Sequence, residues 1–274
     1  MAHVVILGAG TGGMPCAYEM KEALGSGHDV TVINEREYFQ FTPSNPWVAV
    51  GWRTREAITF DIKGYLAKKN ISFVAKRVDA IDAEGSSLTF EDGETMSYDY
   101  LVIATGPKLF FEEVEGAGPH GGNTHSVCTV DHAEMAYGDY QKLLEKGSGH
   151  IVIGAMPFAS CFGPAYEFAF IVDADLRKRK LRHKFKMTYV SSEPYIGHLG
   201  LGGVGDSKSM LESELRNHHI DWVVNAKTTS VEPGKMNVEE IAADGSVAKN
   251  HEIEFDFAMM LPAFKGVDAV AAVE

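Results

Sequence analysis

Three cysteines are the residues best suited to redox chemistry in this 274-residue chain. They are Cys16, Cys128 and Cys161, too few and too scattered for a disulfide framework, and without the paired spacing of a zinc site. We therefore expect no metal site. A thiolate is a nucleophile that exchanges with other sulfur atoms, so these residues suit sulfur chemistry.

Cys161 stands out because of the segment that carries it, 151-IVIGAMPFASCFGPAYEFAFI-171. The pattern predicts the strand, turn and helix of a dinucleotide-binding unit. In place of the usual glycines the turn has Met156, Pro157 and Phe158, which add bulk, and the proline lacks an N–H donor. The turn is therefore poorly made for a dinucleotide. Cys161 should lie near the start of the following helix, where a thiol pKa falls.

Candidate proton-transfer groups stand near these cysteines in the sequence. Glu167 follows Cys161 on the same expected helix and could act as a general base, or simply cap or pack the helix. His132 lies four residues after Cys128, so both could share a helical face. His198 lies in a glycine-rich loop and could protonate substrate or acceptor. Each histidine could also be structural.

A second pattern at the N-terminus indicates the opening of a Rossmann fold. Residues 3–8 predict a buried strand, and the GxGxxG segment that follows precedes a helix and a strand over 30–34. Gly8 would permit the turn, Gly10 would let a pyrophosphate approach, and Gly13 would let helix and strand pack. At the end of the second strand, Asn34 or Glu35 would hold a ribose, or Glu35 would be a surface charge.

These elements predict the organisation of the chain. An aromatic, proline-rich loop follows over 38–52, and short strands over 71–106 end in an ATG segment, as in flavin-binding Rossmann domains. A helix from about Asp131 to Leu144, with Asp131 as its N-cap, precedes the second unit. We expect an α/β fold of two tandem Rossmann-like three-layer domains, the second inserted in the first. The expected boundaries are 1–110 for the FAD-binding part, 111–256 for the second domain and 257–274 for the return.

Composition limits the function classes. The net charge of −13 disfavours a nucleic-acid binder, and 45% hydrophobic residues allow a sizeable core. No run of 18 apolar residues predicts a membrane span, and the N-terminus shows no signal peptide. The basic run over 177–186 is most simply a solvated face, with contact to membrane headgroups as the lesser alternative.

Several sequence blocks together resemble the bacterial sulfide:quinone oxidoreductases, within the two-dinucleotide-fold flavoprotein disulfide reductase superfamily. The blocks are GAGTGGMP, YFQFTPSNPWVAVGW, YDYLVIATGPKL, SVCTVDHA, VIGAMPFASCFGPAYEF, SSEPYIGHLGLGGVGDSK and PAFKG. The resemblance implies FAD-dependent oxidation of sulfide to sulfur or polysulfide through a cysteine persulfide and a flavin adduct, with a membrane quinone as acceptor. It also implies a peripheral protein of a bacterial cell membrane. The sequence leaves the oligomeric state open, with a homo-oligomer as one alternative.

The resemblance also assigns residues. Cys161 matches one of two cysteines that bridge over the flavin, and Cys128 matches an assisting cysteine. The resemblance also favours His132 and His198 as catalytic groups, whereas Glu167 is a candidate from its position on the helix alone. Cys16 matches no redox cysteine and is read as structural. The cofactor contacts that it implies are Gly8, Ala9, Gly10, Thr11, Gly12, Gly13, Asn34, Glu35, Thr42, Pro43, Ser44, Val78 through its backbone, Thr105 and Gly106.

Members of the resembled family are longer, so we expect this chain to lack a C-terminal part. That part would carry the second bridging cysteine, the quinone pocket and the helices that meet the membrane surface. We therefore expect the chain alone to bind FAD weakly and to be inactive. Three alternatives stay open: a type II NADH:quinone dehydrogenase, the flavoprotein subunit of a flavocytochrome sulfide dehydrogenase, and a non-catalytic dinucleotide-binding module.

Overall fold

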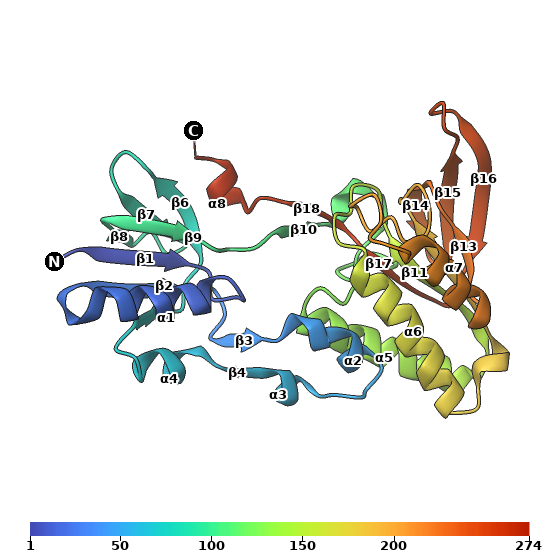
Figure 1. Cartoon of the computed structure of the whole chain (residues 1–274), viewed down its shortest axis with the longest axis horizontal. Coiled ribbons are helices and arrows are strands. Elements are labelled where there is room, and N and C mark those ends of the chain that lie inside the picture. The colour runs from blue at the N-terminus through green and yellow to red at the C-terminus, as the bar shows by residue number, and fades with distance from the viewer. Residues whose placement is uncertain (274) are drawn as a thin grey trace. The chain divides into compact units, whose positions relative to one another are not determined.

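The computed structural model describes residues 1–273, which divide into two compact units. Unit 1 contains residues 1–41, 58–108 and 265 onward, and unit 2 contains 42–57 and 109–264. Each unit is built on a four-stranded parallel sheet. Figure 1 labels the central strands β1 and β11 of these sheets. The expected α/β class with two Rossmann-like domains, one inserted in the other, is confirmed.

Unit 1 places strands in the order β5-β2-β1-β9, all parallel. Their bounds are β1 His3–Leu7, β2 Asp29–Ile33, β5 Ser72–Val74 and β9 Tyr100–Ile103. The remaining elements of unit 1 are α1 Gly13–Leu24, the antiparallel pair β3 Tyr38–Gln40 and β4 Thr59–Asp61, α4 Ile62–Ala67, the antiparallel strands β6 Val78–Asp82, β7 Ser87–Phe90 and β8 Thr95–Ser97, and α8 Asp268–Ala271.

Both faces of this sheet are covered because its central strand is apolar throughout. Val4 and Ile6 of β1 pack with Ala17 of α1, whereas Val5 and Leu7 point to the opposite face and pack with β7 and α8. Figure 1 shows α1 on one side of β1 and β6–β8 on the other. A continuous apolar run is what a strand buried on both faces requires.

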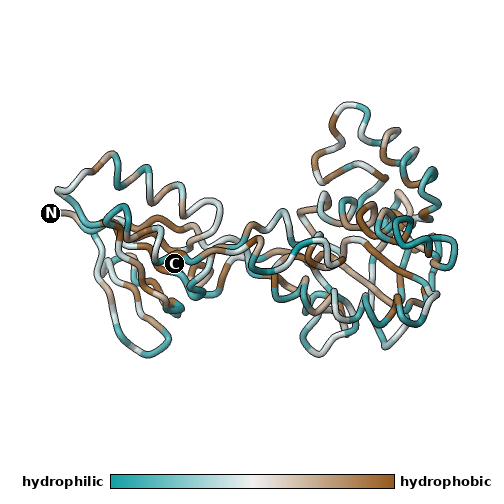
Figure 2. The backbone as a smooth tube through the Cα atoms, turned by 90° about the horizontal axis from the view of Figure 1, so that it is seen from below, coloured by the Kyte–Doolittle hydropathy of each residue, from teal (hydrophilic) through white to brown (hydrophobic). Residues whose placement is uncertain are grey.

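Unit 2 repeats the arrangement in the order β13-β12-β11-β17, again all parallel. These strands are β11 Gly149–Ala155, β12 Phe185–Ser191, β13 Asp221–Val223 and β17 Phe257–Leu261. The other elements are α2 Asn45–Ala49, α3 Arg55–Ile58, α5 Val130–Lys146, α6 Gly163–Lys178, α7 Ser207–Asn217 and the antiparallel strands β14 Ala226–Glu232, β15 Lys235–Ile241 and β16 Val247–Glu254. Short strands β10 Lys108–Phe110 and β18 Ala263–Lys265 pair with each other. Hydrophobic segments, brown in Figure 2, run through each unit.

The boundaries differ from the expected ones in two places. Residues 257–264 stay in unit 2 because β17 is the parallel partner of β11, so the chain returns to unit 1 only at Lys265. Residues 42–57, expected in the FAD-binding part, belong to unit 2. Trp52 explains this, since its Nε1–H donates to Asp175 Oδ1 at 2.8 Å, and the carboxylate is buried on α6.

The helix expected from Asp131 begins one residue earlier, at Val130. Its N-cap is Thr129, whose hydroxyl accepts from the His132 N–H at 3.1 Å, so the expectation that Asp131 caps the helix is wrong. Thr129 has the extended backbone that an N-cap adopts. Asp131 instead forms an ion pair with Arg55.

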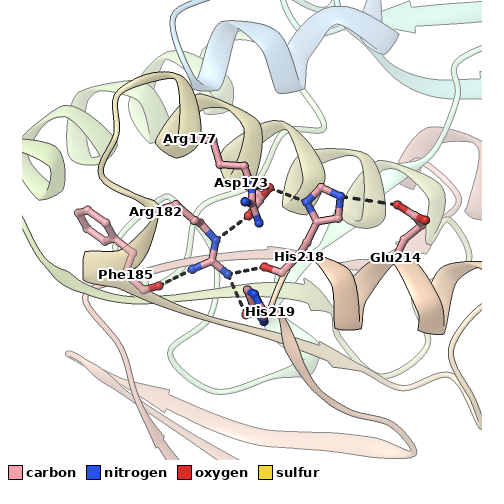
Figure 3. A network of polar contacts seen from close by, with 7 residues as sticks. All are labelled: Asp173, Arg177, Arg182, Phe185, Glu214, His218 and His219. Atoms are coloured by element: carbon pink, nitrogen blue, oxygen red, sulfur yellow. Dashed lines mark hydrogen bonds and ion pairs between the residues drawn. The ribbon is translucent and has the colours of Figure 1, made fainter.

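The basic run over 177–186 has a structural role (Figure 3). Asp173 is fully buried on α6, and accepts from Arg177 Nε at 2.6 Å, Arg182 Nε at 2.5 Å and His218 Nδ1 at 2.5 Å. Burial raises the pKa of this carboxyl, but the three hydrogen bonds outweigh it, so the pKa lies below its ordinary value. The network joins α6 to the ends of α7 and β12 and explains part of the positive charge without a ligand.

Candidate functional site

The glycine turn of unit 1 has the geometry that its spacing predicts. Gly8 has φ of +109°, and a Cβ there would lie 2.2 Å from the carbonyl oxygen of Ala104. A Cβ on Gly13 would lie 1.9 Å from the carbonyl oxygen of Gly8. Gly10 and Gly12 instead face open space. Two glycines therefore close the packing of strand and helix, and two leave the backbone accessible to a ligand.

Asn34 holds this turn. Its Oδ1 accepts from the Ala9 N–H at 3.1 Å, and its Nδ2 donates to the Arg36 carbonyl at 2.7 Å. Both ends of the amide are thus engaged with backbone. Glu35, the next residue, is exposed. Of the two residues predicted to bind ribose, Glu35 has the side chain better placed to do so.

A cavity of about 550 Å³ opens beside the turn, at the carboxyl ends of the parallel strands. Ligands of doubly wound sheets bind at this edge. Five predicted residues line it, Gly8, Asn34, Glu35, Val78 and Thr105, joined by Leu7, Ile33, Lys76, Arg77, Asp79, Lys108, Val267, Asp268 and Ala269.

The lining residues that the sequence did not indicate are mostly charged. Lys76 is ion-paired with Asp92 and Glu94, Arg77 with Asp79, and Lys108 with Asp268 at 2.8 Å, which brings α8 to the cavity. Lysines and arginines scattered along a chain carry no motif, so only the fold gathers them. Because carboxylates already pair with these cations, the exposed glycine turn and the start of α1 are the better site for a phosphate. The residues therefore fit an FAD.

The other predicted cofactor residues are distributed unevenly. Ala9 is buried, Thr11 is exposed, and Gly106 has φ of +68° after β9. Thr42, Pro43 and Ser44 form a short 3-10 helix in unit 2, outside the unit that holds the cavity. Ser44 is buried there and accepts from Arg53 Nη1 at 2.6 Å. Cofactor contacts from all of these residues stay predictions.

The turn after β11, the counterpart in unit 2, is built differently. Met156 is fully buried, and its side chain packs in the hydrophobic core with residues of β14 and β15. Phe158 has φ of +61° and is 75% exposed, a strained backbone for a bulky residue. Ser192 Oγ donates to the Met156 carbonyl at 3.0 Å and fixes the turn.

Two of the three cysteines, Cys128 and Cys161, belong to unit 2 and interact electrostatically. Cys161 is exposed, two residues before α6, and its charge acts on Cys128. Burial raises the Cys128 pKa to about 11, although a hydrogen bond with the Ser126 hydroxyl partly offsets this. Partial burial also raises the pKa of Cys161, so the expected lowering at the helix start is not found. Cys16 packs against the core of unit 1, consistent with a structural residue.

His132 is close to Cys128, but not on a shared helical face. The helix begins at Val130, after Cys128, and Ser126 links the two residues: its Oγ accepts from the Cys128 N–H at 3.0 Å and lies 3.4 Å from His132 Nδ1. On its other side, His132 Nε2 lies 3.1 Å from His120 Nε2. Glu167 is exposed on α6.

His198 is held by the residues on either side of it. The Gly197 N–H donates to the Tyr166 hydroxyl at 3.0 Å, and the Leu199 N–H donates to Glu193 Oε1 at 2.7 Å. The Tyr195 ring meets the imidazole edge-on at 5.2 Å. The loop therefore presents His198 in one defined orientation.

Glu193 is a residue that sequence reasoning did not single out. It is 1% exposed, and its Oε2 accepts from the hydroxyls of Tyr166 at 2.8 Å and Ser191 at 2.7 Å. Burial and the neighbouring carboxylate raise the pKa of Tyr166 well above its ordinary value. Its position could have indicated it: Glu193 lies two residues after β12, just as Glu35 lies two residues after β2.

The match to known proteins decides the family. The pyridine nucleotide-disulphide oxidoreductase family matches residues 2–269. The chain belongs to this family. Its members are FAD-dependent flavoproteins, as the glycine turn and cavity of unit 1 lead one to expect. Among residues 1–273, no cluster of three or more His, Cys, Asp or Glu could hold a metal, and no helix could cross a membrane.

Within the family, the chain is 40% identical to the sulfide-quinone reductase of Aquifex aeolicus, over 98% of this chain and 60% of the relative. The crystal structure of the sulfide:quinone oxidoreductase from that bacterium matches with a TM-score of 0.92 over 100% of this chain and 61% of its own. The mitochondrial sulfide:quinone oxidoreductase of Mus musculus is 22% identical over 98% of this chain and 58% of the relative.

More distant members share the fold alone. NDH2 from Plasmodium falciparum, solved in complex with NADH, has a TM-score of 0.78 at 17% identity over 97% of this chain and 56% of its own. The resemblance inferred from the sequence blocks is thus confirmed. The chain spans about 60% of the length of the curated relatives that it matches along its whole length.

Proposed function

We propose that the protein containing this chain oxidises sulfide with FAD and passes the electrons to a quinone. The observation that supports this most directly is the turn after β11, where a buried methionine and a proline replace phosphate-binding glycines and Cys161 is exposed. The similarity to the sulfide-quinone reductase of Aquifex aeolicus supports the same reading.

FAD would be held in unit 1. The open Gly10 and Gly12 amides and the helix start would receive the pyrophosphate, and Glu35 would accept from the ribose hydroxyls. When bound, the flavin supplies a two-electron acceptor that quinone reoxidises. Binding by the 274 residues alone stays a prediction, which a fluorescence titration with FAD decides.

The substrate chemistry would take place at the cysteines of unit 2. Transfer of the sulfur of HS⁻ to the Cys161 thiol gives a persulfide, two electrons and one proton, so a base must accompany the sulfur step. Glu167 on α6 and His198 in its braced loop are the candidate groups for that proton near Cys161. Cys128, whose pKa burial and the charge of Cys161 raise, would accept sulfur from Cys161 by exchange.

The test is anaerobic reduction of the FAD-loaded natural protein by sulfide, followed as loss of the flavin absorbance band. We expect reduction in the wild type and at least a hundredfold slower reduction in Cys161→Ser, with Cys16→Ser as the matched control that leaves the rate unchanged. Equal rates in Cys161→Ser and the wild type would remove the thiol from the mechanism. A flavin that ignores sulfide in the wild type would refute the proposed activity.

Location and partners follow from the same proposal. A quinone acceptor implies contact with a membrane surface, as a peripheral protein. Co-sedimentation with quinone-containing vesicles tests this contact, and its absence would argue for a soluble acceptor such as a cytochrome. Homo-oligomerisation stays a prediction, to be measured by light scattering.

A further inference from the structure

A line of three side chains joins Cys128 to the surface of unit 2. We call Ser126, His132 and His120 the relay residues. Ser126 Oγ accepts from the Cys128 N–H at 3.0 Å and is also hydrogen-bonded to the Cys128 thiol. It lies 3.4 Å from His132 Nδ1, and His132 Nε2 lies 3.1 Å from His120 Nε2. The contacts therefore run without a gap from a thiol to a second histidine.

Burial falls steadily along this line. Ser126 is fully buried, His132 is 6% exposed, and His120 is exposed. His132 and His120 line a cavity of about 480 Å³, whose wall is the glycine-rich loop over 116–122. His120 is thus the group that can exchange protons with water on behalf of a buried pair.

The loop that carries His120 is closed by specific bonds. The Gly118 N–H donates to Thr124 Oγ1 at 2.9 Å, and Asn123 Nδ2 donates to the carbonyls of Gly116 at 3.1 Å and Val231 at 2.9 Å. A Cβ on Gly122 would lie 2.3 Å from the Ala117 carbonyl, so the turn needs a glycine there. This bracing holds the exposed imidazole against the buried one.

The hydrogen-bonding capacities of the groups permit one arrangement of protons that connects the whole line. A hydroxyl has one donor and two acceptor positions, so Ser126 can accept from the Cys128 N–H and thiol and donate to His132 Nδ1. Neutral His132 then carries its proton on Nε2 and donates it to the unprotonated Nε2 of His120. Every donor in the line points toward the cavity.

We propose that Ser126, His132 and His120 carry the proton of the Cys128 thiol to the cavity, with His120 as the last group. The thiol proton moves to Ser126 as the serine proton moves to His132 Nδ1; His132 Nε2 gives its proton to His120 Nε2, and His120 releases its Nδ1 proton to water. One proton leaves and a thiolate remains, without change of oxidation state. The proposal rests on the proposed function, because sulfur exchange at Cys128 requires the thiolate.

Several titratable and charged groups surround the relay residues. Glu112 and Glu115 line the cavity, Asp131 at the start of α5 forms an ion pair with Arg55, and burial and the charge of Cys161 raise the pKa of Cys128. His120 acts through His132, so it is a positioning and proton-transfer residue and does not touch the substrate.

The experiment compares flavin reduction by sulfide in the wild type, His120→Ala and His120→Gln, in a buffer without imidazole. Glutamine keeps a hydrogen bond to His132 but cannot pass a proton. We expect both variants to be at least tenfold slower and imidazole to restore His120→Ala. His183→Ala, which removes an equally exposed histidine, should match the wild type. A wild-type rate in either His120 variant, or a loss that imidazole does not restore, overturns the relay.

A second measurement does not depend on sulfide. In the ¹⁵N spectrum of the imidazoles we expect neutral His132 to be protonated on Nε2 and unprotonated on Nδ1. A proton on Nδ1 would break the line at Ser126 and overturn the relay. If sulfide fails to reduce the wild-type flavin, the proposed function fails, and this spectrum still decides whether the relay geometry exists.

Discussion

The two Rossmann-like units place turns of contrasting construction after corresponding strands. After β1, the turn has glycines at the positions where side chains would collide or block a ligand; after β11, it has a buried methionine, a proline and an exposed phenylalanine. The glutamates two residues after β2 and β12 show the same contrast. Glu35 is exposed beside a cavity, whereas Glu193 is buried and both of its carboxylate oxygens accept hydrogen bonds. One parallel-sheet plan thus carries a turn open to a ligand in unit 1 and a filled turn with an exposed cysteine in unit 2.

The first residues of α1 and α6 provide the sharpest test of this contrast. A Cβ on Gly13 would overlap the Gly8 carbonyl, whereas a Cβ on Gly163 meets nothing within 4 Å. We expect Gly13→Ala to lower the free energy of unfolding by roughly 3 kcal/mol or more, and Gly163→Ala to change it by less than about 0.5 kcal/mol. Urea unfolding followed by circular dichroism measures both. Equal effects would mean that the two helix starts pack alike.

The thiols of unit 2 should differ strongly in reactivity. With a pKa of about 11, Cys128 holds far less thiolate at pH 8 than an ordinary cysteine, so iodoacetamide should label it about a hundredfold more slowly in the folded chain than in urea. Its rate should rise as the pH approaches 11. Because the folded pKa is raised, folding stability falls as pH increases from the unfolded pKa toward 11. Mass spectrometry of the labelled peptides checks the rates, and fast labelling of Cys128 at pH 8 would contradict its burial.

The two glutamates after the second strands offer a matched pair. Glu193→Gln removes a charge that accepts from Tyr166, Ser191 and the Leu199 N–H, so we expect a loss of about 2 kcal/mol in unfolding free energy. Glu35→Gln should leave stability unchanged and weaken FAD binding. Thermal unfolding and an FAD titration separate the two. If Glu35→Gln destabilised the fold as much, the contrast between a binding and a structural carboxylate would be lost.

The smallest expected effect concerns Gly10. Its Cβ position is open, so Gly10→Ala should fold normally, but a methyl group there would stand where a pyrophosphate approaches. We expect about tenfold weaker FAD binding, which corresponds to about 1.4 kcal/mol. Fluorescence titration of the FAD-binding natural protein measures this. Unchanged affinity would place the pyrophosphate elsewhere.

The sequence predicted the elements whose residues are constrained locally. The strand, glycine turn and helix over residues 3–24 follow from period and spacing, and Gly8 and Gly13 occupy the positions where a side chain would collide. The exchange of glycines for Met156 and Pro157 likewise indicated a turn unsuited to phosphates. These signals are readable because each residue type has one dominant conformational reason to be there.

Contacts between segments that are distant in the sequence could not be predicted from the sequence. Nothing local indicates that Trp52 would bond Asp175 and draw residues 42–57 into unit 2, or that His120 would meet His132. The lowered pKa expected for Cys161 was also wrong, because the loss of solvent around a thiol depends on tertiary packing. Pairwise contacts of this kind arise from the fold and not from sequence period.

The most direct test of the account is an anaerobic absorbance spectrum of the FAD-loaded natural protein, taken after NADH, then sulfide, then a quinone. The contrast between the turns predicts that NADH leaves the flavin band intact, sulfide bleaches it, and quinone restores it. Bleaching by NADH with no response to sulfide would contradict the account, because the turn after β11 would then bind a dinucleotide despite Met156 and Pro157.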